Sequence, residues 1–481
     1  MKESKYNISL FIFRRDLRLE DNTALIAALE NSDTVIPAFI FDPRQFTDKN
    51  EFKSDSALQF MLESLQELDA ELQKKGSRLY VFYGDSQEVI AKLFLEQKID
   101  AIFLNSDYTP FSLKRDEAIE HLCAKHNVQL EQFKDELLID PQNFKTGNGD
   151  PYSIFTPFFK KAFQQDVSEP VKNKYKNYFN KDIKGGKLDM LAPFDPSTGL
   201  GTRASGGNNK SARGELVEPY EHNNNLWVQG GRKNALKILS TLKDFKNYDK
   251  TRDYPSIDTT NLSPYLKFGA CSIREAYYAI YNQLGGNHSL IRSLFWRDFF
   301  TYVTYHSPFV FRHAYKEKYD KIAWSYDKAK FKLWCAGKTG FPIVDAGMRQ
   351  LNETGFMHNR VRMITASFLI KDLHIDWQWG EKYFAQKLVD YDPSVNNGNW
   401  QWVASTGCDS TPYFRIFNLW LQQKKFDPEC LYIKTWIPEL KDVSAKIIHK
   451  AYENIIKNYP KPICDHKVEA AITLKMYKKI L

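Results

Sequence analysis

Tryptophan is absent from the first 226 residues of this chain. All 10 tryptophans lie at or beyond Trp227, although aromatic residues make up 15% of the 481 positions. No apolar run approaches the length of a membrane span, and the run near the N-terminus is too short for a signal peptide. The six cysteines include no CxxC pair, which argues against a zinc site and is typical of reduced thiols in the cytosol. We therefore expect a cytosolic protein, without a metal or a membrane segment, whose two halves are built differently.

Glycine is absent from the turn after the first expected strand, where the sequence reads FRRDLRLEDN (13–22). A dinucleotide-binding fingerprint needs glycines there so that pyrophosphate can approach the backbone. We therefore expect no conventional dinucleotide site at this turn, and we expect the main cofactor elsewhere in the chain.

The charge balance is compatible both with a nucleic-acid partner and with a mildly basic enzyme. The net charge is +8 and the sequence pI is about 8.8, which permits an anionic partner without demanding one. Hydrophobic residues make up 43% and charged residues 26%, as in folded proteins. A chain of 481 residues is too long for one ordinary core, so we expect two domains.

The first part of the chain alternates short apolar runs with amphipathic segments. The apolar runs, rich in Val, Ile, Phe and Tyr, predict strands over 8–13, 34–41, 78–83, 100–105 and 128–133. The amphipathic segments predict helices over 22–31, 56–76 and 112–126. Strict alternation of strand and helix favours right-handed crossovers. Residues 1–135 are therefore predicted to form an α/β domain with a doubly wound, parallel, five-stranded sheet.

The rest of the chain divides into a linker and a helical domain. Residues 136–226 look irregular, and 197–225 form an insertion of low complexity, rich in Gly, Asn and Ser. From 227 to 481 the apolar spacing is helical, as in 231–242, 272–284 and 341–355. We expect an all-helical second domain.

One expected helix carries polar residues on an apolar face. From about Met357, helical spacing brings Asn359, Arg362, Met363 and Ala366 onto one face. Burying an Asn and an Arg is costly unless polar groups meet them. Two interpretations stay open: an internal network in which Arg362 pairs with an aspartate of its own domain, or a ligand site.

The segment DYDPSVNNGNWQWVASTGCD (390–409) holds Trp400 and Trp402 two residues apart in polar surroundings. This spacing fits neither a core helix nor a long half-buried strand. We interpret the segment as an irregular piece of chain that forms a functional site.

Four motifs resemble those of one known family. TGFPIVDAGMRQLNETGFMHNRVRM (339–363), SFLIKDLHIDW (367–377), NNGNWQWVASTGCDSTPYFRIFN (396–418) and RRDLRLEDNTAL (14–25) are similar to blocks of the DNA photolyase and cryptochrome family. The likeness covers nearly the whole chain outside the insertion. HNR at 358–360 and WQW at 400–402 resemble class I cyclobutane pyrimidine dimer photolyases.

The resemblance implies one reduced FAD per chain in the helical domain and light-driven electron donation to a flipped-out pyrimidine dimer in UV-damaged DNA. Asn396 would lie beside the flavin nitrogen that gains a proton on reduction. The implied cofactor-binding residues are Tyr248, Thr259, Thr260, Asn261, Leu262, Ser263, Asn359, Arg362, Asp390, Tyr391, Asp392 and Asn396. Taken alone, without the resemblance, the segment 259–263 would be interpreted as a plain helix cap.

The resemblance also implies an electron path and a DNA site. Trp400 would donate to the flavin first, with Trp377 next and Trp324 at the surface, and Trp379 is an additional indole nearby. Without the family, each of these indoles is more commonly a core residue. The implied DNA-contacting residues, among which Trp296 and Trp402 would wall the dimer pocket, are Arg252, Ser293, Trp296, Arg297, Asn359, Arg360, Met363, Trp402, Arg415 and Gln422.

The chain departs from the family pattern in three places. Ser293 stands three residues before Trp296, where class I photolyases usually carry a Glu that hydrogen-bonds the dimer. Phe111 and Ser112 replace an Asn-Glu pair of folate-binding members, which argues against folate as antenna. A deazaflavin, a second flavin and no antenna all stay open. FNLW (417–420) replaces a family FNP in the DNA-facing loop.

Two rival functions remain beside repair by a monomeric enzyme. A cryptochrome-like photoreceptor would keep FAD and the tryptophans but lack repair, and Ser293 favours it. HNR, Trp402 and the expected absence of a long signalling tail beyond Leu481 favour repair. A dark flavin oxidoreductase would want a nicotinamide site, for which no glycine fingerprint is present.

Overall fold

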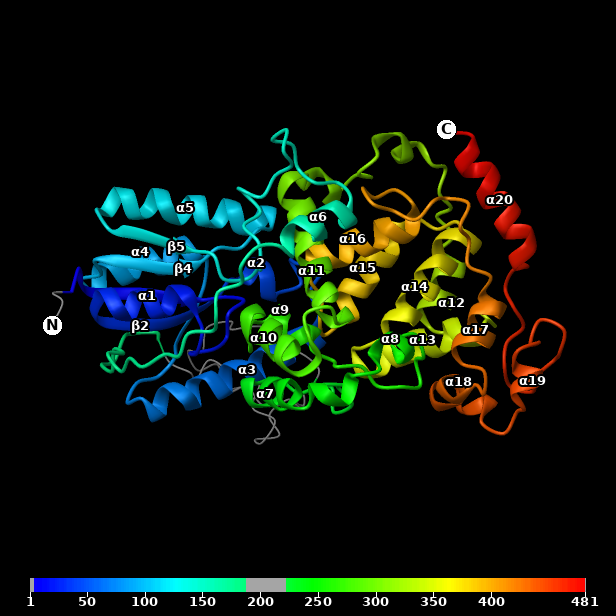
Figure 1. The fold of residues 1–481 in the computed structure, drawn as a ribbon, viewed down its shortest axis with the longest axis horizontal. Coiled ribbons are helices and arrows are strands. Elements are labelled where there is room, and N and C mark those ends of the chain that lie inside the picture. Colours follow the sequence, from blue (N-terminus) through cyan, green and yellow to red (C-terminus); the bar gives the residue numbers. More distant parts are fainter. Residues whose placement is uncertain (1–3, 187–221, 481) are drawn as a thin grey trace, which may run out of the picture.

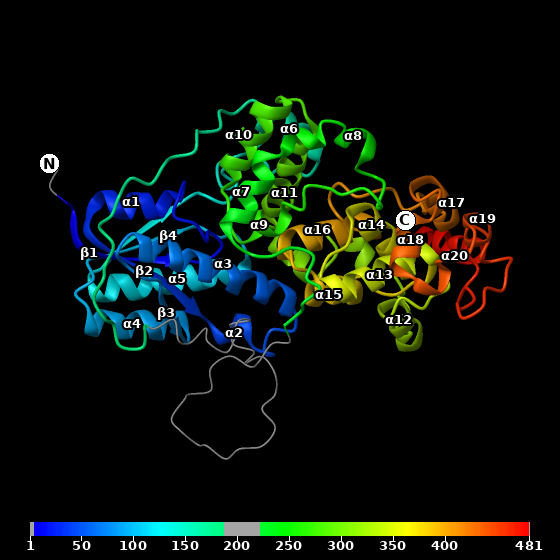
Figure 2. The same ribbon diagram turned by 90° about the horizontal axis from the view of Figure 1, so that it is seen from below.

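The computed structural model describes residues 4–186 and 222–480. Most of the 197–225 insertion lies outside the described residues, so that prediction is not tested. The sheet domain occupies one end of the long axis and the helical domain the other (Figures 1 and 2). Among the described residues, no helix is long and apolar enough to cross a membrane.

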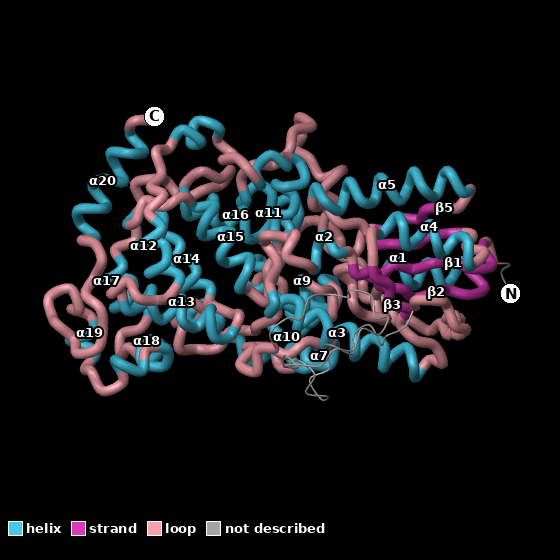
Figure 3. Tube along the Cα trace, turned by 180° about the vertical axis from the view of Figure 1, so that it is seen from behind, coloured by secondary structure: helices cyan, strands magenta, loops and turns pink. Residues whose placement is uncertain are grey.

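The N-terminal domain is a parallel five-stranded sheet in the order β3-β2-β1-β4-β5 (Figure 3). Its strands are β1 (Tyr6–Phe13), β2 (Ser32–Phe41), β3 (Tyr80–Tyr83), β4 (Ala101–Asn105) and β5 (Gln129–Phe133). Its helices are α1 (Thr23–Asn31), α2 (Pro43–Phe46), α3 (Asp55–Lys74), α4 (Ser86–Glu96) and α5 (Pro110–His126). All five predicted strands are confirmed.

The alternation of β1 explains the two layers of helices. Phe11 and Phe13 point to one face and join the core formed with α1 and α3. Leu10 and Ile12 point to the other face and pack with α4 and α5. The strand order reverses between β1 and β4, because the chain runs outward from β1 to β3 and then returns. In such sheets, ligands bind beyond the carboxyl ends of the strands at this reversal.

The linker contains a helix that the sequence interpretation missed. Residues 136–186 are mostly loop, as expected, but α6 (Phe155–Ala162) lies within them. Phe155 and Phe158 of α6 are buried, and the helix lies beside α11 (Ser289–His306) of the helical domain (Figure 1). This part of the linker is therefore packed into the core rather than draped over the surface.

The C-terminal domain is helical, as predicted. Besides α11, its α-helices are α7 (Arg232–Ser240), α8 (Tyr248–Thr251), α9 (Ser263–Lys267), α10 (Ile273–Leu284), α12 (Lys328–Cys335), α13 (Pro342–Thr354), α14 (Asn359–Ser367), α15 (Trp377–Lys387), α16 (Pro393–Ala404), α17 (Leu419–Phe426), α18 (Leu431–Trp436), α19 (Ala445–Ile448) and α20 (His466–Lys478). Short 3₁₀ or π turns are η3 (Leu242–Phe245), η4 (Pro308–Phe311), η5 (Glu317–Lys321), η6 (Phe368–Asp372) and η7 (Pro438–Leu440).

The expectation of irregular chain around the two close tryptophans was wrong, because α16 runs through that segment. Asp392 caps the helix by accepting hydrogen bonds from the amides of Ser394 and Val395, and Pro393 occupies its first position. The helix ends where Ser405 adopts a left-handed φ of 64°. Trp400 and Trp402 therefore lie in the last turns of a helix in which several polar residues, among them Asn396 and Gln401, are buried.

Candidate active site

A cavity of about 600 Å³ lies in the helical domain between α8, α11, α14, α16 and the segment 259–263. This volume is in the range of small-molecule and cofactor sites. Every predicted cofactor residue lines it. The predicted DNA residues that also line it are Arg252, Ser293, Trp296, Arg297, Asn359, Arg360, Met363 and Trp402. Arg415 and Gln422 are not part of this lining, nor are Trp377 and Trp324.

Asp390 connects two other polar residues of the cavity lining through hydrogen bonds. Its Oδ2 accepts hydrogen bonds from the Ser263 hydroxyl at 2.6 Å and from Arg362 Nη2 at 3.0 Å. The expected pairing of Arg362 with an aspartate of its own domain is thus present, and because Arg362 also lines the cavity, the ligand interpretation stays a prediction. Asp390 Oδ1, however, is buried and has no hydrogen-bond partner in the described part of the chain. Because a buried acceptor without a donor is costly, this oxygen fits a hydroxyl or N–H group of a ligand, and the donor set suits a polyhydroxylated cofactor such as FAD.

The segment 259–263 is not a side-chain helix cap. The short helix α9 begins at Ser263 without a capping hydrogen bond from a side chain. Asn261 holds a left-handed φ of 51°, which turns the chain toward the cavity wall. The hydroxyls and amides of this segment are therefore placed along the cavity rather than on the end of the helix.

Asn396 is fixed by α15. Its side-chain Nδ2 donates to the backbone carbonyl of Glu381 at 3.0 Å, and the neighbouring Asn397 donates to Glu381 Oε1 at 2.9 Å. Burial raises the pKa of Glu381 to about 8, so this carboxyl is largely protonated at neutral pH. The polar side of α16 is thus held by uncharged partners, and Asn396 presents a fixed amide to the cavity.

A charged cluster closes the cavity on the side of the sheet domain. Arg15 pairs with Glu136 at 2.7 Å and with Asp392. Burial raises the pKa of Asp392, but Arg15 and Lys267 outweigh it and hold this pKa well below its usual range. Arg297, a predicted DNA-contacting residue, donates to Glu136 Oε1 at 3.1 Å. Its guanidinium is therefore engaged at the wall.

Two indoles at the cavity are candidates for stacking on bases. Trp296 is half-buried and lies face to face on Phe155 of α6, with ring centroids 3.6 Å apart and planes within 8°. Phe155 thereby supports one face of the indole. Trp402 lines the same cavity from α16 and is also half-buried.

The three predicted relay tryptophans differ in burial. Trp400 and Trp377 are buried, and Trp324 is partly exposed. Trp400 packs so tightly on α15 that a Cβ at Gly380 would lie 2.2 Å from its ring. The order of burial is compatible with a path to the surface, which stays a prediction.

The remaining predicted DNA-contacting arginines differ in exposure and in partners. Arg252 and Arg415 are exposed, and Arg360 pairs with Asp253 at 2.8 Å while lying 4.4 Å over the ring of Phe426. Ser293 is exposed at the cavity, and its hydroxyl donates to the carbonyl of Ser289. No group of residues that could hold a metal ion occurs within 4–186 and 222–480.

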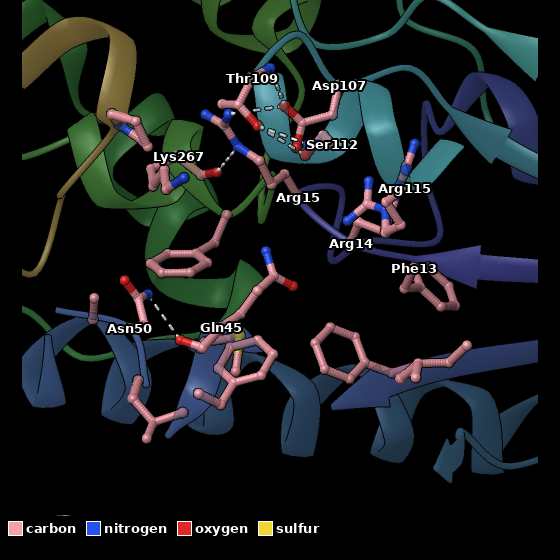
Figure 4. Close-up of a pocket in the computed structure, with 18 of the residues that line it drawn as sticks. Phe13, Arg14, Arg15, Gln45, Asn50, Asp107, Thr109, Ser112, Arg115 and Lys267 are labelled. Atoms are coloured by element: carbon pink, nitrogen blue, oxygen red, sulfur yellow. Dashed lines mark hydrogen bonds and ion pairs between the residues drawn. The ribbon is translucent and has the colours of Figure 1, made fainter. Parts of the chain in front are cut away.

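A second cavity, of about 210 Å³, lies where the strand order reverses (Figure 4). Arg14 and Arg15 follow β1 into it, and Asp107 and Thr109 reach it from the end of β4. Ser112 also lines it, whereas the ring of Phe111 contacts the guanidinium of Arg44 at 5.3 Å. Lys267 and Tyr391 line both cavities, so the two share a wall.

Comparison with known proteins identifies the family. Residues 9–174 match the family model for DNA photolyase, and 290–479 match the FAD binding domain of DNA photolyase. The chain is 36% identical to the deoxyribodipyrimidine photo-lyase of Alkalihalophilus pseudofirmus, with 97% of each chain covered. It belongs to the DNA photolyase family. The recognition made from the motifs is thereby confirmed, and residues 290–479 of the helical part match the FAD-binding domain of this family.

Solved structures agree with this assignment. A photolyase of Sulfolobus tokodaii, described with two FAD molecules, superposes with a TM-score of 0.85 at 44% identity, covering 98% of this chain and 100% of that one. The cryptochrome of Synechocystis superposes with a TM-score of 0.83 at 27% identity, covering 99% and 100%. The two-domain photolyase fold is therefore shown for this chain.

Sequence reasoning missed several residues that build the site. Phe155 was placed in an irregular linker, although apolar residues at 155, 158, 159 and 163 follow helical spacing. Glu136 and Glu381 were not singled out, because an isolated glutamate gives no signal of the partner that it meets in space. Trp334 also carried no motif of its own.

Proposed function

We propose that this protein repairs UV-damaged DNA by splitting cyclobutane pyrimidine dimers with light, as a monomer in the cytosol. The observation that carries the proposal is the cavity of about 600 Å³, which joins a polar cofactor lining to two indoles suited to an extruded pyrimidine dimer. The names of the relatives support it, since the Alkalihalophilus protein is a deoxyribodipyrimidine photo-lyase. When bound, reduced FAD absorbs light and supplies the electron that splits the dimer.

The residues of the chain would bind the cofactor, stack on the extruded bases and attract the DNA phosphates. Asp390, held by Ser263 and Arg362, offers its free oxygen to a cofactor hydroxyl or N–H group. Trp296 and Trp402 offer flat apolar faces, and each base stacked on such a face gains about 1–3 kcal/mol. Arg252, which is exposed and lines the cavity, supplies positive charge to the DNA phosphates.

The second cavity is suited to an antenna chromophore. Arg14, Arg15 and Lys267 line it and suit an anionic group. The two FAD molecules of the Sulfolobus photolyase support a second flavin over folate. The replacement of the folate-type Asn-Glu pair by Phe111 and Ser112 points the same way.

Light-dependent repair is tested directly with damaged DNA. The purified protein, reduced anaerobically, is mixed with an oligothymidine carrying cyclobutane dimers, and the ultraviolet absorbance of restored thymines is followed. We expect recovery under near-ultraviolet light and none in the dark. If flavin is bound but neither repair nor DNA binding occurs, the photoreceptor function, which the similarity to the Synechocystis cryptochrome favours, replaces this proposal.

Ser293→Glu should improve repair. Ser293 lies one helical turn before Trp296 on α11 and lines the same cavity, so a longer carboxyl group there can reach a base edge. A net hydrogen bond contributes about 1 kcal/mol, so lesion affinity should rise roughly fivefold. The yield of repaired dimers per absorbed photon should rise with it. Ser293→Ala is the matched control and should not improve either quantity; an unchanged Ser293→Glu variant would show that this position does not touch the lesion.

A further inference from the structure

Trp400 has an indole neighbour that the family resemblance does not assign to the electron path. The ring of Trp334, on α12, lies 6.3 Å from that of Trp400. Trp334 is fully buried, and its Nε1 donates to the carbonyl of Thr365 at 3.1 Å. The indole is therefore fixed in ring contact with the residue that would be oxidised first.

The aromatic contacts continue from Trp334 to the surface. Phe331 lies 5.7 Å from Trp334, Trp379 lies 5.1 Å from Phe331, and Tyr326 lies 5.7 Å from Trp379. Phe331 and Trp379 are half-buried, and Tyr326 is 62% exposed. Because phenylalanine is much harder to oxidise than tryptophan, Phe331 would bridge two indoles without itself losing an electron.

Tyr383 also contacts Trp334, but it is a poor electron donor in its surroundings. Tyr383 lies 5.7 Å from Trp334, and its hydroxyl donates to Asn352 Oδ1 at 2.6 Å. Burial raises the pKa of Tyr383, and a neutral amide is a poor acceptor for the proton that an oxidised phenol must release. A hole reaching Trp334 would therefore move on toward Trp379.

The path that the resemblance implies ends differently. Trp324 lies 6.3 Å from Tyr477, whose hydroxyl is buried and donates to the carbonyl of Ala404. Lys371 Nζ lies 3.9 Å over the same ring and opposes a positive charge there. Burial lowers the pKa of Lys371 to about 7. At neutral pH only part of the Lys371 side chains carry the positive charge that disfavours oxidation of Tyr477. Tyr477 has no water-exposed route for its proton, whereas Tyr326 has one.

We infer that Trp334, Trp379 and Tyr326 form a second electron outlet from Trp400, which ends in proton release to water. The inference rests on the proposed function, since the oxidant is a photoexcited oxidised flavin that takes one electron from Trp400. Trp334 refills Trp400, Trp379 refills Trp334 across Phe331, and Tyr326 refills Trp379. Tyr326 then loses its phenol proton to water and remains a neutral radical, while the single electron stays on the cofactor. Loss of the proton makes the return of the electron slow.

The test is flash photolysis of the oxidised, flavin-loaded protein, with transient absorption separating tryptophan radicals from the sharp band of a neutral tyrosyl radical. We expect a tyrosyl signal in the native protein that Tyr326→Phe and Trp379→Phe each abolish. Both side chains are at least partly exposed, so neither change should unfold the chain. Tyr413→Phe is the matched control, because Tyr413 stacks on Tyr477 beside the other path, and it should leave the signal intact.

The outcomes separate the two proposals. In Trp324→Phe the tyrosyl yield should rise, because the second outlet then carries the whole hole current. A tryptophan radical without a tyrosyl signal, or a signal that survives Tyr326→Phe, overturns the second outlet and leaves the repair function standing. Absence of every radical, with flavin bound, overturns both electron outlets, and it leaves repair by the chemically reduced protein to its own test.

Discussion

Asp390→Ala should yield a folded protein that no longer retains its flavin. The substitution removes the acceptor shared by Ser263 and Arg362, and it removes the buried second oxygen that has no partner in the described part of the chain. Hydrogen bonds to charged groups contribute about 1.5–3 kcal/mol, so losing even one such bond to the ligand weakens FAD binding roughly ten- to a hundredfold. The loss of order around Arg362 adds to this. The measurement is the flavin-to-protein absorbance ratio after purification, followed by titration of the apoprotein with FAD.

Two further variants make this result specific. Asp390→Asn keeps an oxygen that can accept from Ser263 and should lose less affinity than Asp390→Ala. Asp253→Ala removes an aspartate that pairs with Arg360 in the same cavity, and it should keep its flavin. Stoichiometric flavin in Asp390→Ala would show that the buried oxygen does not face the cofactor.

Trp400→Phe should stop blue-light reduction of the oxidised flavin while leaving the flavin bound. Trp400 lines the cavity and contacts both Phe384, at 5.0 Å, and Trp334. Phenylalanine fills much of the same space but cannot be oxidised at a comparable potential, so both outlets lose their first member. The measurement is the rate of flavin bleaching under blue light with an external reductant, alongside thermal unfolding. Trp420→Phe, in which a distant indole that stacks on Phe341 is removed, should keep the native rate. Reduction of Trp400→Phe at the native rate would refute the assigned donor.

Local patterns predicted the sheet because its rules are local. In β1, alternate residues face opposite layers of helices, and the run of apolar residues shows this directly in the sequence. The helix α16 was not predicted, because its buried polar residues are paired with groups that lie elsewhere in the chain. Asn397 donates to Val310 O and to Glu381, and a window of sequence that reads as polar and irregular contains neither partner.

The candidate site was predicted through motifs, and its polar geometry was not. The cofactor residues carried over by resemblance do line one cavity, but the pairing of Arg362 with Asp390, rather than with some other aspartate, could not be read from spacing. Arg297 shows the same limit: it was expected to contact DNA, and its pairing with Glu136 in the cavity wall could not be foreseen from the sequence. Such choices depend on which charges the fold brings together.

The contacts made by residues 136–163 have a consequence for how such a protein can be divided. Leu138 donates its amide to Asp298, Tyr152 donates its amide to the hydroxyl of Tyr302, and Phe155 backs Trp296. Residues 136–163, which precede the helical domain in the chain, thus pack against α11 and support the side chains there. A chimaera that exchanges the sheet domain between relatives should therefore be joined before residue 136, because a cut at 227 would separate Trp296 from its support. The residues that form the cavity and the residues that support it therefore come from separate stretches of the chain.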